Sequence, residues 1–158
     1  MRRFDEPVRS DQRYIDRHGV YAVIREGDDV LVTEQADPGP ELQLPGGGID
    51  PGEGVLHALH RECLEETGWR IRVRSRLGAF QRYTYMPEYD PWARKVCHIY
   101  LCHPVRRHGP PSEHGHTALW MPIATAARFL GNAGDRWFVD QNARRLARGG
   151  ARNQMISR

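Results

Sequence analysis

The sequence has few cysteines and no hydrophobic run long enough to cross a bilayer. Its 158 residues include 3 cysteines, an odd number without the spacing of a zinc finger. We therefore expect reduced, partly buried thiols in a cytoplasmic protein. The first 16 residues are charged and contain no apolar segment. Neither a secretory signal nor a membrane partner is expected.

The chain also has little excess charge and no zinc-protease motif. Its 8 histidines are scattered, and no pair of them has the helix-face spacing with a glutamate that zinc proteases use. The net charge is +3, which is too small for a protein that coats nucleic acid, so no specific nucleic-acid binding is expected. The basic excess is mostly arginine, which suits forked contacts to phosphate. A general compositional habit of the genome would explain the same excess.

The length favours a single domain. We expect an N-terminal arm at 1–16, one domain at 17–148 and a flexible tail at 149–158. Patterns of β-branched and apolar residues predict strands at 20–25, 30–34, 42–44, 69–82, 95–105 and 118–121. Helices are predicted at 53–67, 122–130 and 135–148, with Asp135 as the cap of the last. This order of elements predicts an α/β protein with a mixed sheet and helices on its faces.

Three glutamates crowd one face of the predicted helix at 53–67. At 100° per residue, Glu62, Glu65 and Glu66 fall in a sector roughly 100° wide. Glu62 and Glu66 form a like-charge i, i+4 pair, which costs a few tenths of a kcal/mol on an ordinary helix. The segment has one cation, Arg61, whereas a solvated exterior helix usually interleaves lysines. The face therefore indicates a divalent cation, and its hard oxygen ligands suit Mg²⁺, which also bridges to substrate phosphates.

The segment around these glutamates resembles the Nudix box, G-x5-E-x7-R-E-U-x-E-E-x-G-U, where U is bulky and apolar. Every fixed position is filled, by Gly47, Glu53, Arg61, Glu62, Glu65, Glu66 and Gly68. Cys63 and Trp69 occupy the apolar positions, and cysteine acts there as a small hydrophobe. The resemblance implies an α/β/α sandwich. It also implies hydrolysis of a diphosphate that is linked to another moiety, usually a nucleoside.

The resemblance further implies roles for individual residues. Glu62, Glu65 and Glu66 are expected to hold Mg²⁺, for which Mn²⁺ can substitute, and the Gly46 carbonyl is expected to be a further ligand. Glu62 and Glu65 are also expected to take part in catalysis. An ion pair between Glu53 and Arg61 is expected to support the junction of loop and helix. The glycines Gly47 and Gly68 are expected to support it as well.

The attacking water also needs a base. One of the box glutamates can serve, but in relatives the base or an extra ligand often comes from a later loop, shortly before a strand that carries tryptophan. Glu113 lies seven residues before Trp120 and is our candidate, with an ordinary loop glutamate as the alternative. His114 and His116 are weaker candidates, which we expect to face solvent.

Aromatic and basic side chains follow the box, and they are Phe80, Arg82, Tyr83, Tyr85, Tyr89, Trp92, Arg94 and Lys95. We expect Tyr85, Arg82 and Arg94 to contact the substrate, because rings stack on nucleobases and arginines meet phosphates. Packing in the sheet is the alternative, and we prefer it for Phe80. In the family, a tyrosine at this distance beyond the box is typical of dinucleoside polyphosphate hydrolases, and a proline of ADP-ribose hydrolases. The chain has both, Tyr85 and Pro87, so the substrate stays open among dinucleoside polyphosphates, ADP-ribose, nucleotide sugars and oxidised dNTPs.

Two other functions share the fold. A non-catalytic nucleotide-sensing module would have lost box glutamates and would carry a DNA-binding segment, whereas this chain keeps every glutamate. An isoprenoid diphosphate isomerase would have a divergent box and a cysteine before it, and no cysteine precedes Cys63. We therefore expect a Nudix hydrolase acting on a small nucleotide, as a monomer or homodimer.

Overall fold

The computed structural model describes residues 1–36, 39–85 and 92–156, with side chains up to residue 145. Pro87 and Tyr89 lie outside the described residues. The elements in chain order are β1 (Arg2–Asp5), β2 (Tyr14–Glu26), β3 (Asp29–Gln35), β4 (Glu41–Gln43), β5 (Gly46–Gly48), α1 (Val55–Thr67), β6 (Trp69–Tyr85), β7 (Trp92–Arg107), β8 (His116–Pro122), α2 (Ile123–Phe129) and α3 (Ala133–Ile156). Every strand and helix predicted from the sequence is present. Most ends differ by a few residues, but β2 begins at Tyr14 instead of 20 and α3 ends at Ile156 instead of 148.

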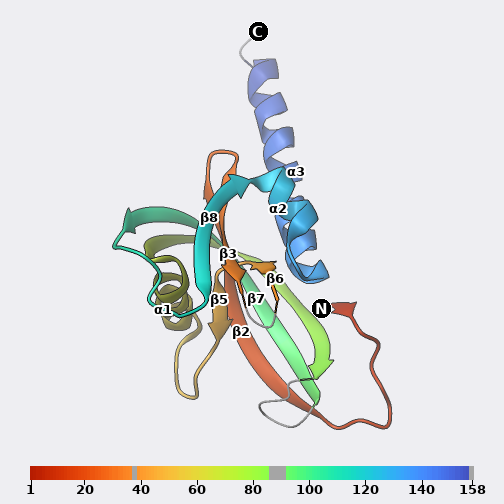
Figure 1. The fold of residues 1–158 in the computed structure, drawn as a ribbon. Coiled ribbons are helices and arrows are strands. Elements are labelled where there is room, and N and C mark those ends of the chain that lie inside the picture. Colours follow the sequence, from red (N-terminus) through yellow and green to blue (C-terminus); the bar gives the residue numbers. More distant parts are fainter. Residues whose placement is uncertain (37–38, 86–91, 157–158) are drawn as a thin grey trace.

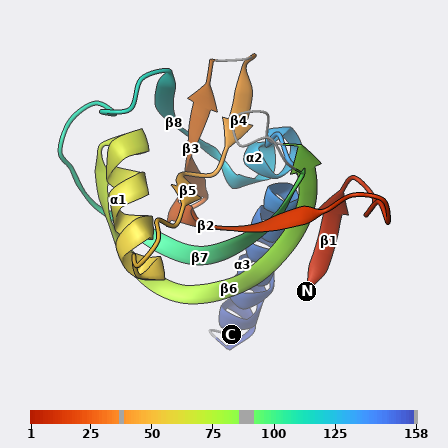
Figure 2. The same ribbon diagram turned by 90° about the horizontal axis from the view of Figure 1, so that it is seen from below.

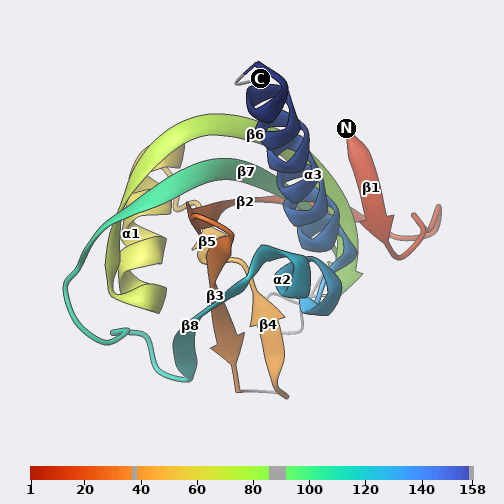
Figure 3. The ribbon, with the colours of Figure 1, turned by 90° about the horizontal axis from the view of Figure 1, so that it is seen from above.

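The strands form one mixed sheet in the order β1-β6-β7-β2-β3-β4, in which β5 also pairs with β2 and β8 with β3. The β2–β7 and β1–β6 pairs are parallel, and the others are antiparallel. Helix α1 lies on one side of the sheet, and α2 and α3 lie on the other (Figures 1 and 3). Figure 2 shows β6 and β7 as long curved strands that run side by side. The predicted α/β architecture with a mixed sheet is therefore confirmed.

Strand β2 has buried side chains on both faces of the sheet. Val20, Ala22 and Ile24 belong to the hydrophobic cluster beneath α1, together with Leu59. Val23 belongs to the second cluster, which includes residues of α2 and α3. Successive side chains of a strand point to opposite faces, so this one strand helps to fix the helices of both layers.

Strand β5 consists of three glycines and was not predicted as a strand. It pairs with β2, with Gly46 opposite Tyr21 and Gly48 opposite Gly19. Gly46 has φ +150, and a Cβ there would collide with the backbone carbonyl of Val20. The missing side chains therefore allow a close approach of backbones, which strand propensities do not register.

The predicted N-terminal arm at 1–16 contains a strand, β1, that pairs with β6. Phe4 gives this charged segment an anchor, because its ring lies 5.5 Å from that of Phe80 in an edge-on arrangement. Residues 14–16 already belong to β2. The predicted arm is therefore docked in part through β-pairing and one aromatic contact.

The chain ends in α3, which runs through most of the segment 149–158 that we predicted as a tail. The helix starts earlier than predicted, and its cap is Asn132, whose Oδ1 accepts a hydrogen bond from the Asp135 amide at 2.8 Å. Asp135 lies inside the first turn instead of capping it. Among the described helices, none combines the length and the apolar character that a bilayer span requires.

Candidate active site

Helix α1 carries the three box glutamates and has a glycine just beyond each end. Gly54 precedes it, and Gly68 ends it in the left-handed conformation with φ 74, its amide donating to the Leu64 carbonyl at 2.9 Å. A side chain at Gly68 would collide with the carbonyl of Gly109. Gly68 thus acts as the C-cap and lets the loop before β8 pass close to the end of the helix.

Arg61 and Glu53 form a forked ion pair at the junction of loop and helix. Arg61 Nε and Nη2 each lie 2.8 Å from an oxygen of Glu53, and Nη2 also donates to the Gly48 carbonyl at 3.2 Å. The Arg61 hydrogen bond is the main reason that the pKa of Glu53 falls to about 2. The pair joins the glycine loop to α1, as the family resemblance led us to expect.

Glu62 and Glu65 share the remaining nitrogen of Arg61. Its Nη1 lies 3.0 Å from Glu62 Oε1 and 3.4 Å from Glu65 Oε2. Burial raises the pKa of Glu62, whose side chain is 13% exposed, against the lowering effect of Arg61. A Cβ at Gly47 would lie 2.5 Å from Glu62 Cδ, so the glycine leaves room for that carboxylate.

Glu66 is the most buried of the three box glutamates, with a side chain that is 7% exposed. Its Oε2 accepts a hydrogen bond from the Gly46 amide at 3.1 Å. Burial raises its pKa to about 8, and the charges of Glu62, Glu113 and Glu65 add to this effect. A carboxylate in such surroundings is neutral near pH 7 unless a cation compensates its charge.

The loop between β7 and β8 brings Glu113 to this face. The amides of Ser112 and Glu113 both donate to the Glu65 carbonyl, at 2.9 and 3.1 Å. Candidate ligand atoms of Glu62, Glu65 and Glu113 consequently lie within 4.8 Å of one another. The loop position of Glu113 was predicted from the sequence, and the structure places it beside the box glutamates.

His116 is buried, contrary to our expectation that it faces solvent. Its side chain is 8% exposed, with Nδ1 at 4.0 Å from Glu66 Oε1 and Nε2 at 3.9 Å from Glu113 Oε1. His114, two residues earlier, is exposed as expected. We had named His116 as a weaker candidate, but the sequence did not indicate its burial, because it is the first residue of β8 and its position depends on β-pairing.

These residues fit a divalent cation. The carboxylates of Glu62, Glu65 and Glu113 form one set, and Glu66, Glu113 and His116 form a second. The acidic charge exceeds what Arg61 compensates, since its nitrogens already contact Glu53, Glu62 and Glu65. Glu66 is buried 4.0 Å from Nδ1 of His116, a ring that is cationic only when protonated, and this Nδ1 atom has no hydrogen-bond partner among the described residues. Gly46 reaches the site through its amide, and a ligand role for its carbonyl stays a prediction.

A family model described as NUDIX domain matches residues 16–141, which include most of β2, all elements from β3 to α2, and the start of α3. The chain belongs to the Nudix family.

Relatives of this Nudix chain support the same assignment. It is 38% identical over 66 residues to a putative 8-oxo-dGTP diphosphatase of Bacillus subtilis (42% of this chain and 44% of the relative). It is 46% identical over 57 residues to an RNA pyrophosphohydrolase of Helicobacter pylori (33% and 37%). The chain thus spans less than half the length of these relatives. A solved Nudix hydrolase from Nitrosomonas europaea has the same fold, with a TM-score of 0.66 and 21% identity over 80% of this chain and 87% of that one.

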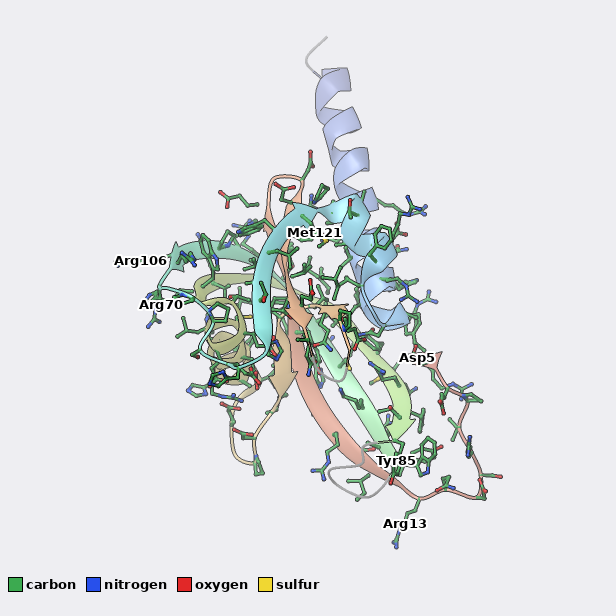
Figure 4. The ribbon with its side chains drawn as sticks, in the orientation of Figure 1. Asp5, Arg13, Arg70, Tyr85, Arg106 and Met121 are labelled. Carbon is green, nitrogen blue, oxygen red and sulfur yellow. The ribbon has the colours of Figure 1, made fainter. Side chains whose placement is uncertain are left out.

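A cavity of about 270 Å³ lies where β6 and β7 meet the start of α3. Tyr85 and Arg82, two of the three predicted substrate contacts, line it. Figure 4 shows Tyr85 at the end of β6, far from Arg70 at the start of the strand. Tyr85 is 48% exposed and lies against Trp92, with ring centroids 5.5 Å apart. Its exposed ring is therefore available to a ligand.

The two arginines differ in their surroundings. Arg82 Nε lies 3.1 Å from Asp5 Oδ2, without the alignment of a hydrogen bond. Arg94, the third predicted contact, is not among the residues that line the cavity. Its Nη1 lies 3.0 Å from Asp16, and its Nε donates to Gln81 at 2.9 Å. A substrate role for Arg94 remains a prediction without a supporting contact.

The cavity is also lined by residues that we had not predicted as substrate contacts, among them Tyr21, Asn132 and Asp135. The Asp135 side chain is buried, and burial raises its pKa to about 6 against hydrogen bonds with Asn132 and the Leu44 backbone. Tyr21 is paired with Gly46 of β5, so the cavity adjoins the Nudix box. The polar helix start at 132–135 was the one sequence signal for this part of the site.

Proposed function

We propose that this chain is a Mg²⁺-dependent pyrophosphohydrolase that cleaves the diphosphate of a nucleoside diphosphate linked to another moiety. The observation that carries the proposal is the convergence of Glu62, Glu65, Glu66 and Glu113 on one partly buried site. A pyrophosphate brings further negative charge, so it can approach these carboxylates only together with cations. Family membership and the names of both relatives support the same class of reaction.

The residues of the Nudix box have two proposed roles, to bind the metal and to restrain the carboxylates. Glu62, Glu65 and Glu66 would hold the cation, and Mn²⁺ would fit the same oxygens. When bound, the divalent ion supplies Lewis-acid polarisation of the phosphoryl oxygens and lowers the pKa of a coordinated water. Arg61 and Gly46 restrain the carboxylates, through hydrogen bonds to Glu62 and Glu66 respectively.

Glu113 would supply the general base or an additional metal ligand. Its side chain is 45% exposed and belongs to both carboxylate sets, so it lies where a water can reach it from solvent. Two backbone hydrogen bonds to the Glu65 carbonyl hold its loop against α1. A base must lie within hydrogen-bond reach of the water it deprotonates, and a loop held against α1 supports this role for Glu113.

The cavity of about 270 Å³ would take the nucleoside. This volume is at the low end of ligand pockets, about 300–1,000 Å³, so it suits part of a nucleotide while the phosphates extend towards the box. Tyr85 offers a ring for stacking, and Asn132 and Asp135 offer polar atoms for the edge of a base. Oxidised dNTPs, dinucleoside polyphosphates, ADP-ribose and nucleotide sugars all present such a group.

The state of the cysteines bears on the location that we propose for this enzyme. All 3 cysteines are free and buried, which supports the expected cytoplasmic location. The expected partner is the nucleotide itself, and the expected assembly is a monomer or homodimer.

A release assay tests the proposal. The purified chain is incubated with ADP-ribose, diadenosine polyphosphates, nucleotide sugars and 8-oxo-dGTP, each with Mg²⁺ and with EDTA. We expect Mg²⁺-dependent release of a nucleoside monophosphate from at least one class. Nucleotide binding without turnover of any of them would instead favour the non-catalytic sensing module.

A further inference from the structure

The His116 ring is enclosed beside the carboxylates and has an unused nitrogen. Its side chain is only 8% exposed, and Nδ1 has no hydrogen-bond partner among the described residues. The nearest acidic oxygen to Nδ1, Glu66 Oε1, is 4.0 Å away, beyond hydrogen-bond distance. A buried polar atom without a partner is unfavourable, so this nitrogen is available to a ligand that enters the site.

The surrounding backbone holds the ring in this position. His116 opens β8 and pairs with Gln35 of β3. The preceding residue, Gly115, has φ +79, and its carbonyl accepts a hydrogen bond from the Ala36 amide at 3.1 Å. A ligand that is carried by a paired strand is better oriented than one on a free loop.

Two sets of ligand atoms share Glu113 but differ in chemistry. The set with Glu62 and Glu65 offers oxygen alone, whereas the set with Glu66 offers oxygen together with the His116 imidazole. Mg²⁺ prefers oxygen donors, and imidazole favours first-row transition ions. With donor–metal bonds of about 2.0–2.2 Å, adjacent donors of one ion lie about 3.0–3.5 Å apart, so a movement of roughly 0.5–1 Å brings Nδ1 and Glu66 Oε1, which are 4.0 Å apart, to one ion.

We propose that His116 Nδ1 is a metal ligand, and that Glu66, Glu113 and His116 form an inner site selective for first-row transition ions such as Mn²⁺ and Co²⁺. The oxygen set of Glu62, Glu65 and Glu113 then forms the outer site, which accepts Mg²⁺. This inference rests on the proposed function for the presence of divalent metal, but the nitrogen ligand is a property of this chain's own β8. The two sites are inequivalent, with Glu113 common to both.

Spectroscopy on the unmodified protein is the first test. The full chain is loaded with one equivalent of Mn²⁺, and electron spin-echo envelope modulation detects any directly bound ¹⁴N. We expect nitrogen modulation typical of one imidazole. A Mn²⁺ ion that is bound to the protein with oxygen donors alone would overturn the proposal, and this result is obtained without any variant.

Calorimetry on variants is the second test. Affinities for Co²⁺ and Mg²⁺ are measured for the wild type, His116→Ala and the exposed control His114→Ala, with folding checked by circular dichroism. We expect His116→Ala to weaken Co²⁺ binding at least about tenfold and Mg²⁺ binding less than about threefold, since only the transition ion gains from nitrogen. His114→Ala should change neither. Equal losses for both ions in His116→Ala would assign the ring a merely structural role.

The outcome separates this inference from the proposed function. Mg²⁺-dependent hydrolysis without a nitrogen signal would overturn the role of His116 alone. A chain that binds no divalent ion would overturn both.

Discussion

The backbone amide of Glu113 donates a hydrogen bond to the backbone carbonyl of Glu65 at 3.1 Å. The loop before β8 is therefore tied to the end of α1 through main-chain atoms, supported by the Ser112 amide at 2.9 Å. These two hydrogen bonds involve neither the Glu65 nor the Glu113 carboxylate. A side-chain substitution at either position should consequently leave the loop in place, so that loss of activity can be assigned to the carboxylate.

We expect Glu65→Gln to lower Mg²⁺-dependent turnover at least about 100-fold, because the amide is a poorer and uncharged ligand. The Glu65 side chain is 42% exposed, so the free energy of unfolding should change by less than about 0.5 kcal/mol. Steady-state kinetics and urea unfolding check both values. Glu26→Gln, an exposed glutamate at the end of β2, is the matched control. Full activity in Glu65→Gln would refute our metal assignment.

Gly47→Ala tests the space that the box leaves for Glu62. The new Cβ would lie 2.5 Å from Glu62 Cδ, which forces the carboxylate out of its position. The displaced group is the end of a flexible side chain, so we expect a folded protein with metal affinity reduced about tenfold. Gly48→Ala is the control, because nothing lies within 4 Å of its added Cβ. Equal metal affinities in the two variants would contradict the expected role of Gly47.

Much of the site could be predicted because the Nudix box is local in sequence. Helical spacing alone puts Glu62 and Glu66 on one face, and the pairing of Arg61 with Glu53 needs one loop and two turns of helix. The C-cap at Gly68 follows from the same segment. These features depend on short-range geometry, which periodicity describes well.

The missing parts depend on contacts between distant segments. His116 becomes a neighbour of Glu66 only through the pairing of β8 with β3, and Asn132 lines the same cavity as Tyr85 only after α3 packs on the sheet. The strand β5 is likewise formed by the approach of Gly46 to Tyr21. The intrinsic preference of a residue for helix or strand does not determine which strands pair or in which register. This explains why the burial of His116 was not predicted.

Divalent metal should stabilise the fold, since it neutralises carboxylates that Arg61 only partly compensates. At a Mg²⁺ concentration 100 times the dissociation constant, the expected gain is about 2.7 kcal/mol, or a rise in Tm of roughly 5–10 °C. Differential scanning calorimetry with millimolar MgCl₂ measures it, against NaCl of equal ionic strength. An unchanged Tm would show that this face does not bind the ion.

The pH dependence of metal binding should follow Glu66, whose pKa is raised to about 8 by burial. Below that pH the metal must displace a proton, so apparent affinity should fall up to about tenfold per pH unit between 8 and 6. The metal-free protein should behave in the opposite sense. The Glu66 carboxyl has a pKa of about 8 in the folded state and about 4.3 in the unfolded chain, so the folded state binds its proton more tightly. The free energy of unfolding should therefore decrease as pH rises from about 4 to 8.

Both trends can be measured on the same samples, by calorimetric titration of metal and by urea unfolding with EDTA. Glu66→Gln is the control, because it removes the Glu66 titration and should reduce the pH dependence of both profiles, while Asp135, whose pKa is raised to about 6 by burial, still contributes to the stability profile. A metal-free wild type that gains stability between pH 5 and 8 would show that the Glu66 carboxyl is not shifted in this direction.

Tyr85→Ala should weaken recognition of the nucleoside without affecting the metal. Stacking on an aromatic ring is worth about 1–3 kcal/mol per base, which corresponds to a loss of about 5- to 150-fold in kcat/KM. The side chain is 48% exposed and packs against Trp92, so Tyr85→Phe should retain most of the activity. Phe129→Ala, which removes an exposed ring of α2 that does not line the cavity, is the control. If Tyr85→Ala hydrolyses every substrate as the wild type does, the nucleoside does not stack on this ring and must bind elsewhere.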